Sequence, residues 1–288
     1  MDIADIPPKP VELPTGATLN YIRDGAGDPL VFIHGAMGDY RSWRPQWPHF
    51  TARFDCISYS RRYSFPNPNE LTTHDHNALV DAADLEALLD ALSLDSAILV
   101  GSSYGGFTAL AMAARAPERV KAVVSVEAPM MRYAALTEEG TLISEAFLEN
   151  AARPARAAFI SGDDVEGVRL LTGGISGRAP EAIPAAVLDR RMTNVRAARS
   201  LALSDDEFPW IEPERLAALP MPILLMSGAE TAPVHAAIFR NLCTAMPQAK
   251  VRIIPRSGHS VSQEQAEQFN SEVMAFLAEN RLLAQALA

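Results

Sequence analysis

Short apolar runs recur through the first half of the chain and return near its end. Each run is rich in Val, Ile, Leu or Phe and is bounded by Gly, Pro, Asp or Asn, a pattern typical of buried β-strands. The pattern predicts strands over residues 11–13, 17–23, 30–33, 54–59, 97–100, 120–126, 222–227 and 250–254.

Between these runs the apolar residues follow a helical spacing. The clearest case is the segment 77–92, in which one helix face carries Leu79, Val80, Ala83, Leu85, Leu88 and Leu89. Segments 107–114, 233–246 and 264–288 are also predicted to be helical. Strands that alternate with helices in this way predict an α/β fold built on a mostly parallel sheet.

Residues 131–215 differ from the rest of the chain. They contain no clear strand, are rich in Ala, Arg, Glu and Leu, and are interrupted at Gly162, Gly173, Gly174, Gly177 and Pro180. We interpret this segment as a helical lid made of several short helices. The predicted domains are therefore a core formed by residues 1–130 and 216–288, and a lid formed by residues 131–215.

The pentapeptide Gly101-Ser102-Ser103-Tyr104-Gly105 lies between a predicted strand and a predicted helix. A serine hydroxyl is a poor nucleophile unless it projects from the backbone beside a base and near N–H donors. A sharp strand-to-helix turn achieves this, and only glycine fits two residues before and after the serine. The pattern therefore indicates that Ser103 is a nucleophile.

Two further loops follow predicted strands and carry histidine beside glycine. His34-Gly35-Ala36 follows the strand at 30–33, and Gly258-His259 follows the strand at 250–254. Since the carboxyl ends of parallel strands share one edge of a sheet, the three loops are expected to converge there. His259 is the predicted general base. The predicted oxyanion donors are the backbone N–H groups of Ala36, or alternatively Met37, and of Tyr104.

With these three motifs in order, the chain resembles an α/β-hydrolase over nearly its whole length. The resemblance implies an eight-stranded, mostly parallel sheet with helices on both faces and a helical lid after the sixth strand. It also implies a Ser–acid–His triad, a small-molecule substrate and no cofactor. Dehalogenases and epoxide hydrolases of this family use aspartate where this chain has Ser103, so their chemistry is disfavoured.

The acid departs from the commonest pattern of the family. The usual aspartate after the seventh strand is replaced by Thr231, which cannot balance an imidazolium charge. Glu230 is adjacent but out of frame. Glu127 ends an apolar strand, where burial of a carboxylate needs a reason. Some α/β-hydrolases, including the haloalkane dehalogenases, carry the acid after the sixth strand, so Glu127 is the predicted acid and Glu230 the alternative.

Several other residues have candidate roles in the pocket. Met37, Met130, Met131 and Trp210 are expected to supply apolar walls. Arg61 and Arg62 follow the fourth strand and either bind a substrate carboxylate or form salt bridges, of which we favour the second. His74 and His76 flank Asp75, but no third ligand is evident, so helix capping on the surface is favoured over metal and no metal site is predicted.

Bulk composition excludes several classes of function. The net charge of −10 disfavours nucleic acid and anionic membrane surfaces. No run reaches the roughly 18 apolar residues of a membrane span, and the acidic start lacks the apolar segment of a signal peptide. The two cysteines are expected to be core thiols. We therefore expect a cytoplasmic protein.

The favoured function is hydrolysis of a small ester or lactone through an acyl-enzyme on Ser103. Carbon–carbon bond hydrolases and haloperoxidases (perhydrolases) use the same triad and stay open as alternatives. A ligand receptor with slow turnover on the same fold is an alternative from another class. Neither the physiological substrate nor the oligomeric state is specified by the sequence.

Overall fold

The computed structural model describes residues 2–283 and contains one eight-stranded sheet. The strand order is β1-β2-β4-β3-β5-β6-β7-β8, in which β1 and β2 are antiparallel to their neighbours and β3 to β8 run parallel. The strands are β1 (Lys9–Glu12), β2 (Thr18–Asp24), β3 (Pro29–Ile33), β4 (Asp55–Tyr59), β5 (Ala97–Ser102), β6 (Val120–Val126), β7 (Ile223–Gly228) and β8 (Lys250–Ile254).

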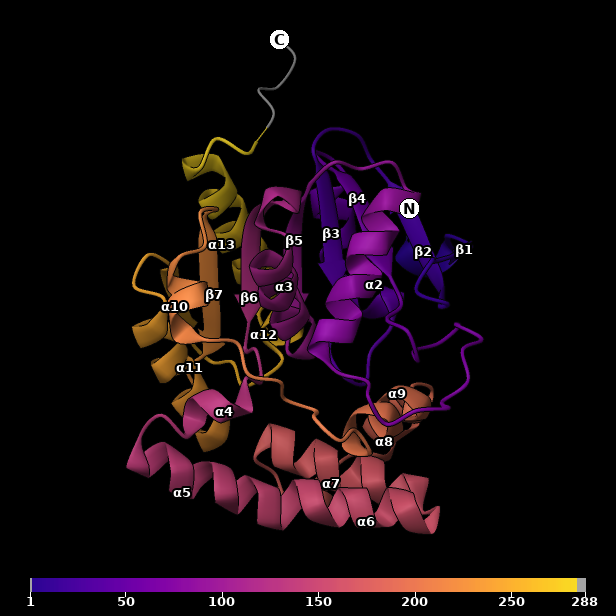
Figure 1. Cartoon of the computed structure of the whole chain (residues 1–288), viewed down its shortest axis with the longest axis vertical. Coiled ribbons are helices and arrows are strands. Elements are labelled where there is room, and N and C mark those ends of the chain that lie inside the picture. Colours follow the sequence, from indigo (N-terminus) through magenta and orange to yellow (C-terminus); the bar gives the residue numbers. More distant parts are fainter. Residues whose placement is uncertain (1, 284–288) are drawn as a thin grey trace.

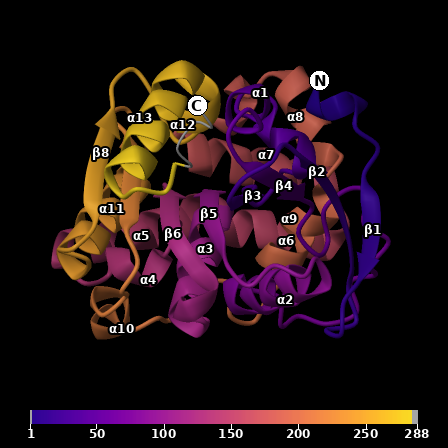
Figure 2. The ribbon, with the colours of Figure 1, turned by 90° about the horizontal axis from the view of Figure 1, so that it is seen from above.

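Helices cover both faces of the sheet, which explains why the central strands are apolar on both sides. The core helices are α1 (Trp47–Phe50), α2 (Ala78–Ala91), α3 (Tyr104–Arg115), α10 (Pro213–Ala217), α11 (Pro233–Ala245), α12 (Val261–Glu264) and α13 (Ala266–Glu279). Helices α2, α3 and α11 pack on one face in the larger apolar cluster. Helices α1 and α13 pack on the other face (Figure 2).

The connection after β6 is a helical insertion that lies beneath one edge of the sheet in Figure 1. Its helices are α4 (Met131–Ala134), α5 (Glu138–Phe147), α6 (Arg153–Ser161), α7 (Asp164–Ser176), α8 (Ala185–Met192) and α9 (Val195–Ala202). Helices α6, α7 and α9 share a small apolar cluster of their own around Phe159 and Val168. The insertion therefore has apolar packing of its own, while Met131, Tyr133, Ala134 and Leu201 join it to the larger cluster.

The predicted α/β architecture is confirmed, including the helical segment after the sixth strand. All eight predicted strands are present, and those at 120–126 and 250–254 have the predicted bounds. The limits 131 and 215 of the lid stay a prediction. The far C-terminal part of the predicted helix at 264–288 lies outside the described residues. No helix within residues 2–283 is long and apolar enough to span a membrane.

Two glycines make the turn from β5 to α3 possible. A Cβ atom at Gly101 would lie 2.1 Å from the carbonyl oxygen of Gly105, and one at Gly105 would lie 2.0 Å from that of Ile33. Both contacts are with backbone that belongs to the sheet or to the turn itself, so no side-chain rotation could relieve them. Close backbone packing therefore explains the glycines on either side of Ser103.

The first prediction concerns this packing. Gly105→Ala is expected to lower the free energy of unfolding by about 3 kcal/mol or more, because the new methyl group collides with the backbone of β3. Gly258→Ala is the matched control, since a Cβ there meets no atom closer than 3.7 Å, and its cost is expected to stay below about 1 kcal/mol. Chemical denaturation of both variants measures the difference, and equal stabilities would contradict the prediction.

Candidate active site

Ser103 occupies the turn between β5 and α3 with a strained backbone. Its φ is 53° and its ψ is −124°, a conformation that residues with a Cβ rarely adopt. The Ser103 N–H donates to the carbonyl of Val126 at 2.7 Å, which attaches the turn to the end of β6. The surrounding packing thus maintains a conformation that projects the hydroxyl away from the backbone.

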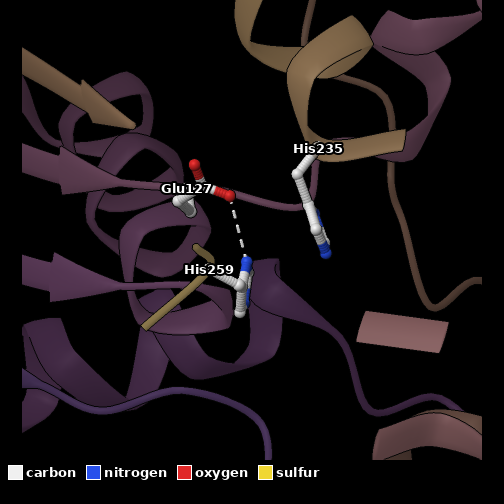
Figure 3. Close-up of side chains that lie close together, drawn as sticks. All are labelled: Glu127, His235 and His259. Atoms are coloured by element: carbon white, nitrogen blue, oxygen red, sulfur yellow. Dashed lines mark hydrogen bonds and ion pairs between the residues drawn. The ribbon is translucent and has the colours of Figure 1, made fainter. Parts of the chain in front are cut away.

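His259 lies on the loop after β8 and contacts both Ser103 and Glu127. Its Nε2 is 2.9 Å from the hydroxyl oxygen of Ser103. Its Nδ1 is 3.1 Å from Oε2 of Glu127, as Figure 3 shows. Because a carboxylate only accepts hydrogen bonds, Nδ1 carries the proton and Nε2 is free to accept from the serine. The three predicted residues are therefore joined in one series of hydrogen bonds.

Glu127 follows β6 and is almost completely buried, with 3% of its surface exposed. Besides His259, its carboxylate accepts from the hydroxyl of Ser227, from the N–H of Gly228 at 2.9 Å and from the hydroxyl of Thr231 at 2.6 Å. Burial alone would raise the pKa of Glu127. The hydrogen bond from His259, the attraction of the carboxylate to His259 and His235, and the hydrogen bond from Ser227 together outweigh burial and lower the pKa of Glu127 to about 2.

The two acid candidates differ in burial and in their contacts. Glu127 is buried against His259, whereas Glu230 is exposed. Within residues 2–283 the side chain of Glu230 forms neither a hydrogen bond nor an ion pair, and its backbone N–H donates to the carbonyl of Ser257 at 2.8 Å. Thr231, at the position of the usual family acid, instead donates to Glu127. A polar residue is therefore retained after β7 as a donor to the carboxylate that reaches in from β6.

Ala36 and Tyr104, which carry the predicted oxyanion donors, line the cavity beside Ser103. Tyr104 is the first residue of α3, where N–H groups lack helical partners and the helix dipole favours negative charge. Ala36 lies on the loop after β3. In the described part of the chain, neither N–H donates to another protein group. Both are thus free to receive an oxyanion.

His34 and Arg61 orient the loop that carries Ala36. The backbone N–H of Arg61 donates to Nε2 of His34 at 2.9 Å, so the imidazole proton is on Nδ1, which donates to the carbonyl of Gly35 at 2.8 Å. Burial and the charge of Arg61 lower the pKa of His34 to about 4, which keeps the ring neutral. Since the carbonyl of Gly35 is held toward these groups, the N–H of Ala36 points the opposite way.

Arg61 and Arg62 are engaged in ion pairs, which agrees with the favoured interpretation. Arg61 is buried and pairs with Asp81, and Arg62 pairs with Asp84 at 2.6 Å. The expectation for His76 was wrong: this ring is buried 3.5 Å from Asp81, and Asn77 caps α2 instead. Packing against Tyr63 and pairing with Asp81 explain its burial.

The cavity beside Ser103 is mostly apolar. Met37 and Met131 line it, together with residues of the insertion: Phe147, Leu171, Ile175, Leu201 and Phe208. Met130 and Trp210 do not line it, which corrects the prediction for both. Met130 is buried in the core cluster, and Trp210 packs against the ring of Tyr133 with centroids 5.2 Å apart.

His235 is a site residue that the sequence did not identify. It comes from α11, lines the cavity and stacks on His259 with ring centroids 4.1 Å apart (Figure 3). Burial, followed by the charge of His259, lowers the pKa of His235 to about 3, so the ring is neutral near pH 7. The helical spacing predicts only that residue 235 faces inward. A histidine in the core would show the same spacing, so the sequence does not identify His235 as a site residue.

Glu127, His235 and His259 each offer one ligand atom, and these atoms lie within 4.8 Å of one another. Zinc requires ligand lone pairs that converge on one point. The two imidazole rings are stacked with an angle of 27° between their planes, so their in-plane lone pairs run side by side. The Nδ1 proton of His259 also occupies the side that faces Glu127. The arrangement therefore suits proton transfer better than metal binding.

Comparison with known proteins agrees with this fold. Residues 28–265 match the family model of the alpha/beta hydrolase fold. A dihydrolipoyllysine-residue acetyltransferase component of the acetoin cleaving system of Pseudomonas putida is 26% identical over 87% of this chain, and the chain spans 64% of that protein. The carboxylesterase YbfK of Bacillus subtilis (strain 168) is 25% identical over 86% of this chain and 79% of its own length.

A further relative is the 2-hydroxy-6-oxononadienedioate/2-hydroxy-6-oxononatrienedioate hydrolase of Paraburkholderia xenovorans (strain LB400), 26% identical over 90% of each chain. Among solved structures, Est816, described as an N-acyl homoserine lactone degrading enzyme, superimposes with a TM-score of 0.72. It covers 93% of this chain and all of its own, at 24% identity. These similarities support the fold and leave the reaction to the site itself.

The second prediction follows from the low pKa of Glu127. A carboxyl group whose pKa falls from 4.5 to about 2 on folding contributes stability that is complete above pH 4.5 and is lost as the pH falls toward 2. That contribution is about 3 kcal/mol. The stability gap between wild type and Glu127→Gln should therefore narrow below pH 4.5.

Denaturant unfolding at pH 7, 5, 4 and 3 measures this gap. Glu230→Gln is the matched control, because Glu230 is exposed, and its gap to wild type should stay small throughout. If the difference in free energy of unfolding between wild type and Glu127→Gln stayed the same from pH 7 to pH 3, this would contradict a native Glu127 that is ionised with a lowered pKa.

Proposed function

The chain belongs to the alpha/beta hydrolase fold family, and we propose that it is a serine hydrolase that cleaves a small carboxylic ester or lactone through an acyl-enzyme on Ser103. The observation that carries the proposal is the hydrogen-bonded series Ser103–His259–Glu127 at the cavity. A serine at a strained turn, a base at 2.9 Å and a buried acid have no evident structural purpose in combination.

In the proposed mechanism His259 accepts the proton of Ser103 through Nε2 as the hydroxyl attacks the carbonyl carbon. Glu127 stabilises the imidazolium and keeps the Nδ1 proton in place. The negative charge on the substrate oxygen is received by the N–H groups of Ala36 and Tyr104. The leaving alcohol takes the proton from Nε2, and a water molecule activated by the same nitrogen releases the acid.

The cavity favours an ester or lactone over the dioate substrate that the Paraburkholderia relative is named for. A dioate carries two carboxylates and needs cationic partners. In the described part of the chain the cavity wall holds neither Lys nor Arg, and its one acidic side chain is that of Glu207. The buried Arg61, on the loop after β4, is already paired with Asp81. An uncharged substrate therefore fits the cavity better.

The third prediction concerns the nucleophile. Ser103→Ala removes one oxygen from the turn and is expected to abolish hydrolysis of short-chain p-nitrophenyl esters while the melting temperature changes little. A fluorophosphonate probe should label wild type at Ser103, as identified by peptide mass spectrometry. Ser102→Ala is the matched control and should keep both labelling and multiple turnover. Labelling at Ser102, or a single burst without turnover in wild type, would count against the proposal.

The fourth prediction concerns the acid. Glu127→Gln is expected to lower kcat by up to about 10⁴-fold, because the amide cannot stabilise the imidazolium or enforce the tautomer. Glu230→Gln should change kcat by less than about twofold, since exposed side chains away from the site have small effects. Steady-state kinetics under identical conditions measures kcat of both variants and shows which glutamate is the acid.

Thr231→Asp combined with Glu127→Gln extends this test. The Thr231 hydroxyl lies 2.6 Å from Oε2 of Glu127, so an aspartate there places a carboxylate near His259 and should recover part of the lost kcat. A Glu230→Gln enzyme slower than Glu127→Gln would reverse the assignment of the acid.

A further inference from the structure

Two polar side chains of the cavity have no part in the proposed chemistry. His235 and Glu207 line the same space as Ser103, among walls that are otherwise apolar. His235 stacks on the catalytic base, whereas the backbone carbonyl of Glu207 accepts from the hydroxyl of Tyr104 at 2.6 Å. A substrate in the cavity would therefore meet a polar group near the base and another near the Tyr104 side chain.

His235 is buried with 4% of its surface exposed, and neither ring nitrogen has a hydrogen-bond partner among residues 2–283. The carbonyl of Ile175 lies near enough to influence the ring but outside hydrogen-bond geometry. An imidazole left unpaired in a buried position costs free energy that a bound ligand can recover. Because the ring is neutral, one nitrogen donates and the other accepts.

Glu207 is half-buried, and within the described residues its carboxylate forms neither a hydrogen bond nor an ion pair. Arg156, the cation whose charge acts on Glu207, donates instead to the carbonyls of Ala202 at 2.7 Å and Ser204 at 3.2 Å. Burial raises the pKa of Glu207 to about 7, against a smaller opposing effect of Arg156. In either protonation state the group can accept a hydrogen bond, and when ionised it repels anions.

We propose that His235 and Glu207 are specificity-determining residues that bind a hydrogen-bond donor on the substrate, so that the preferred substrate is an ester or lactone carrying an amide N–H or a hydroxyl. This inference rests on the proposed function, because it concerns the cavity beside Ser103. Both groups can accept from such a donor, which is the chemistry they share. An apolar acyl chain would leave both the buried His235 ring and the half-buried Glu207 carboxyl unpaired, and a site whose polar groups a ligand leaves unpaired discriminates against that ligand.

A purely structural role for His235 makes a different prediction. If the ring served only to support His259 by stacking, then His235→Phe would keep the supporting surface and would affect all esters alike. If the nitrogens bind substrate, the same variant loses activity selectively on substrates that carry a donor. The comparison therefore needs two substrates that differ only in the donor.

The p-nitrophenyl esters of N-acetylglycine and of 4-oxopentanoic acid form such a pair, since a methylene group replaces the amide N–H in the second. Wild type is expected to prefer the first ester. In His235→Phe and in Glu207→Leu, the ratio of the two kcat/KM values should fall about tenfold, the loss of one hydrogen bond to a buried group, or about 1.4 kcal/mol. His49→Phe and Glu212→Leu, at exposed positions, are matched controls and should keep the wild-type ratio.

The melting temperature of each variant shows whether it is folded. If His235→Phe or Glu207→Leu unfolds, His235→Gln or Glu207→Gln takes its place. The glutamine side chain keeps an acceptor, so these variants should retain part of the preference for the first ester. Calorimetric binding of N-acetylglycine methyl ester to Ser103→Ala protein, with and without His235→Phe, follows the same recognition without turnover. A ratio and a binding constant that neither site variant changes would overturn the inference. Absence of ester hydrolysis by wild type would instead overturn the proposed function.

Discussion

The buried carboxylate of Glu127 is the feature on which the rest of the site depends. A charge with almost no exposure to water is stable only when protein donors replace its hydration. Here the donors come from both segments that follow the last two strands: Ser227, Gly228 and Thr231 around the end of β7, and His259 after β8. The same bonds that stabilise the charge therefore place the base, and removing the carboxylate would free both loops together.

Ser103 and Glu127, the proposed nucleophile and acid, occupy equivalent places in the sheet. Ser102 of β5 pairs with Val126 of β6, so Ser103 and Glu127 are the next residues along two neighbouring parallel strands. Both have a positive φ, 53° and 52°, although neither is glycine. The backbone thus turns away from β5 and from β6 directly after paired residues. Both side chains therefore lie at the carboxyl ends of the parallel strands. Strained backbone at two adjacent strand ends is typical of a site whose geometry is maintained by surrounding packing.

The sequence predicted most of what depends on local pattern. Apolar runs located every strand, and the glycines at 101 and 105 located the turn, because both reflect steric demands on a few consecutive residues. The candidate acid could not be identified from one local pattern. Glu127 was predicted because Thr231 stands at the position of the usual acid and because a glutamate ends the apolar strand at 120–126. His235 and the orientation of Trp210 were beyond reach, because contacts between segments distant in sequence decide which side chains of α11 and of the insertion face the cavity.

The charges on Glu127, His259 and His235 depend on one another. During the proposed reaction one negative charge, on Glu127, faces one transient positive charge, on His259, and the pair stays close to neutral in surroundings of low polarity. Any further ionised group against the His259 ring would disturb that balance. His235 touches the ring at 4.1 Å and is neutral because burial lowers its pKa to about 3. A second histidine is thus compatible with the proposed catalytic pair because burial keeps it neutral, and within residues 2–283 its ring nitrogens have no hydrogen-bond partner, so they are available to a substrate.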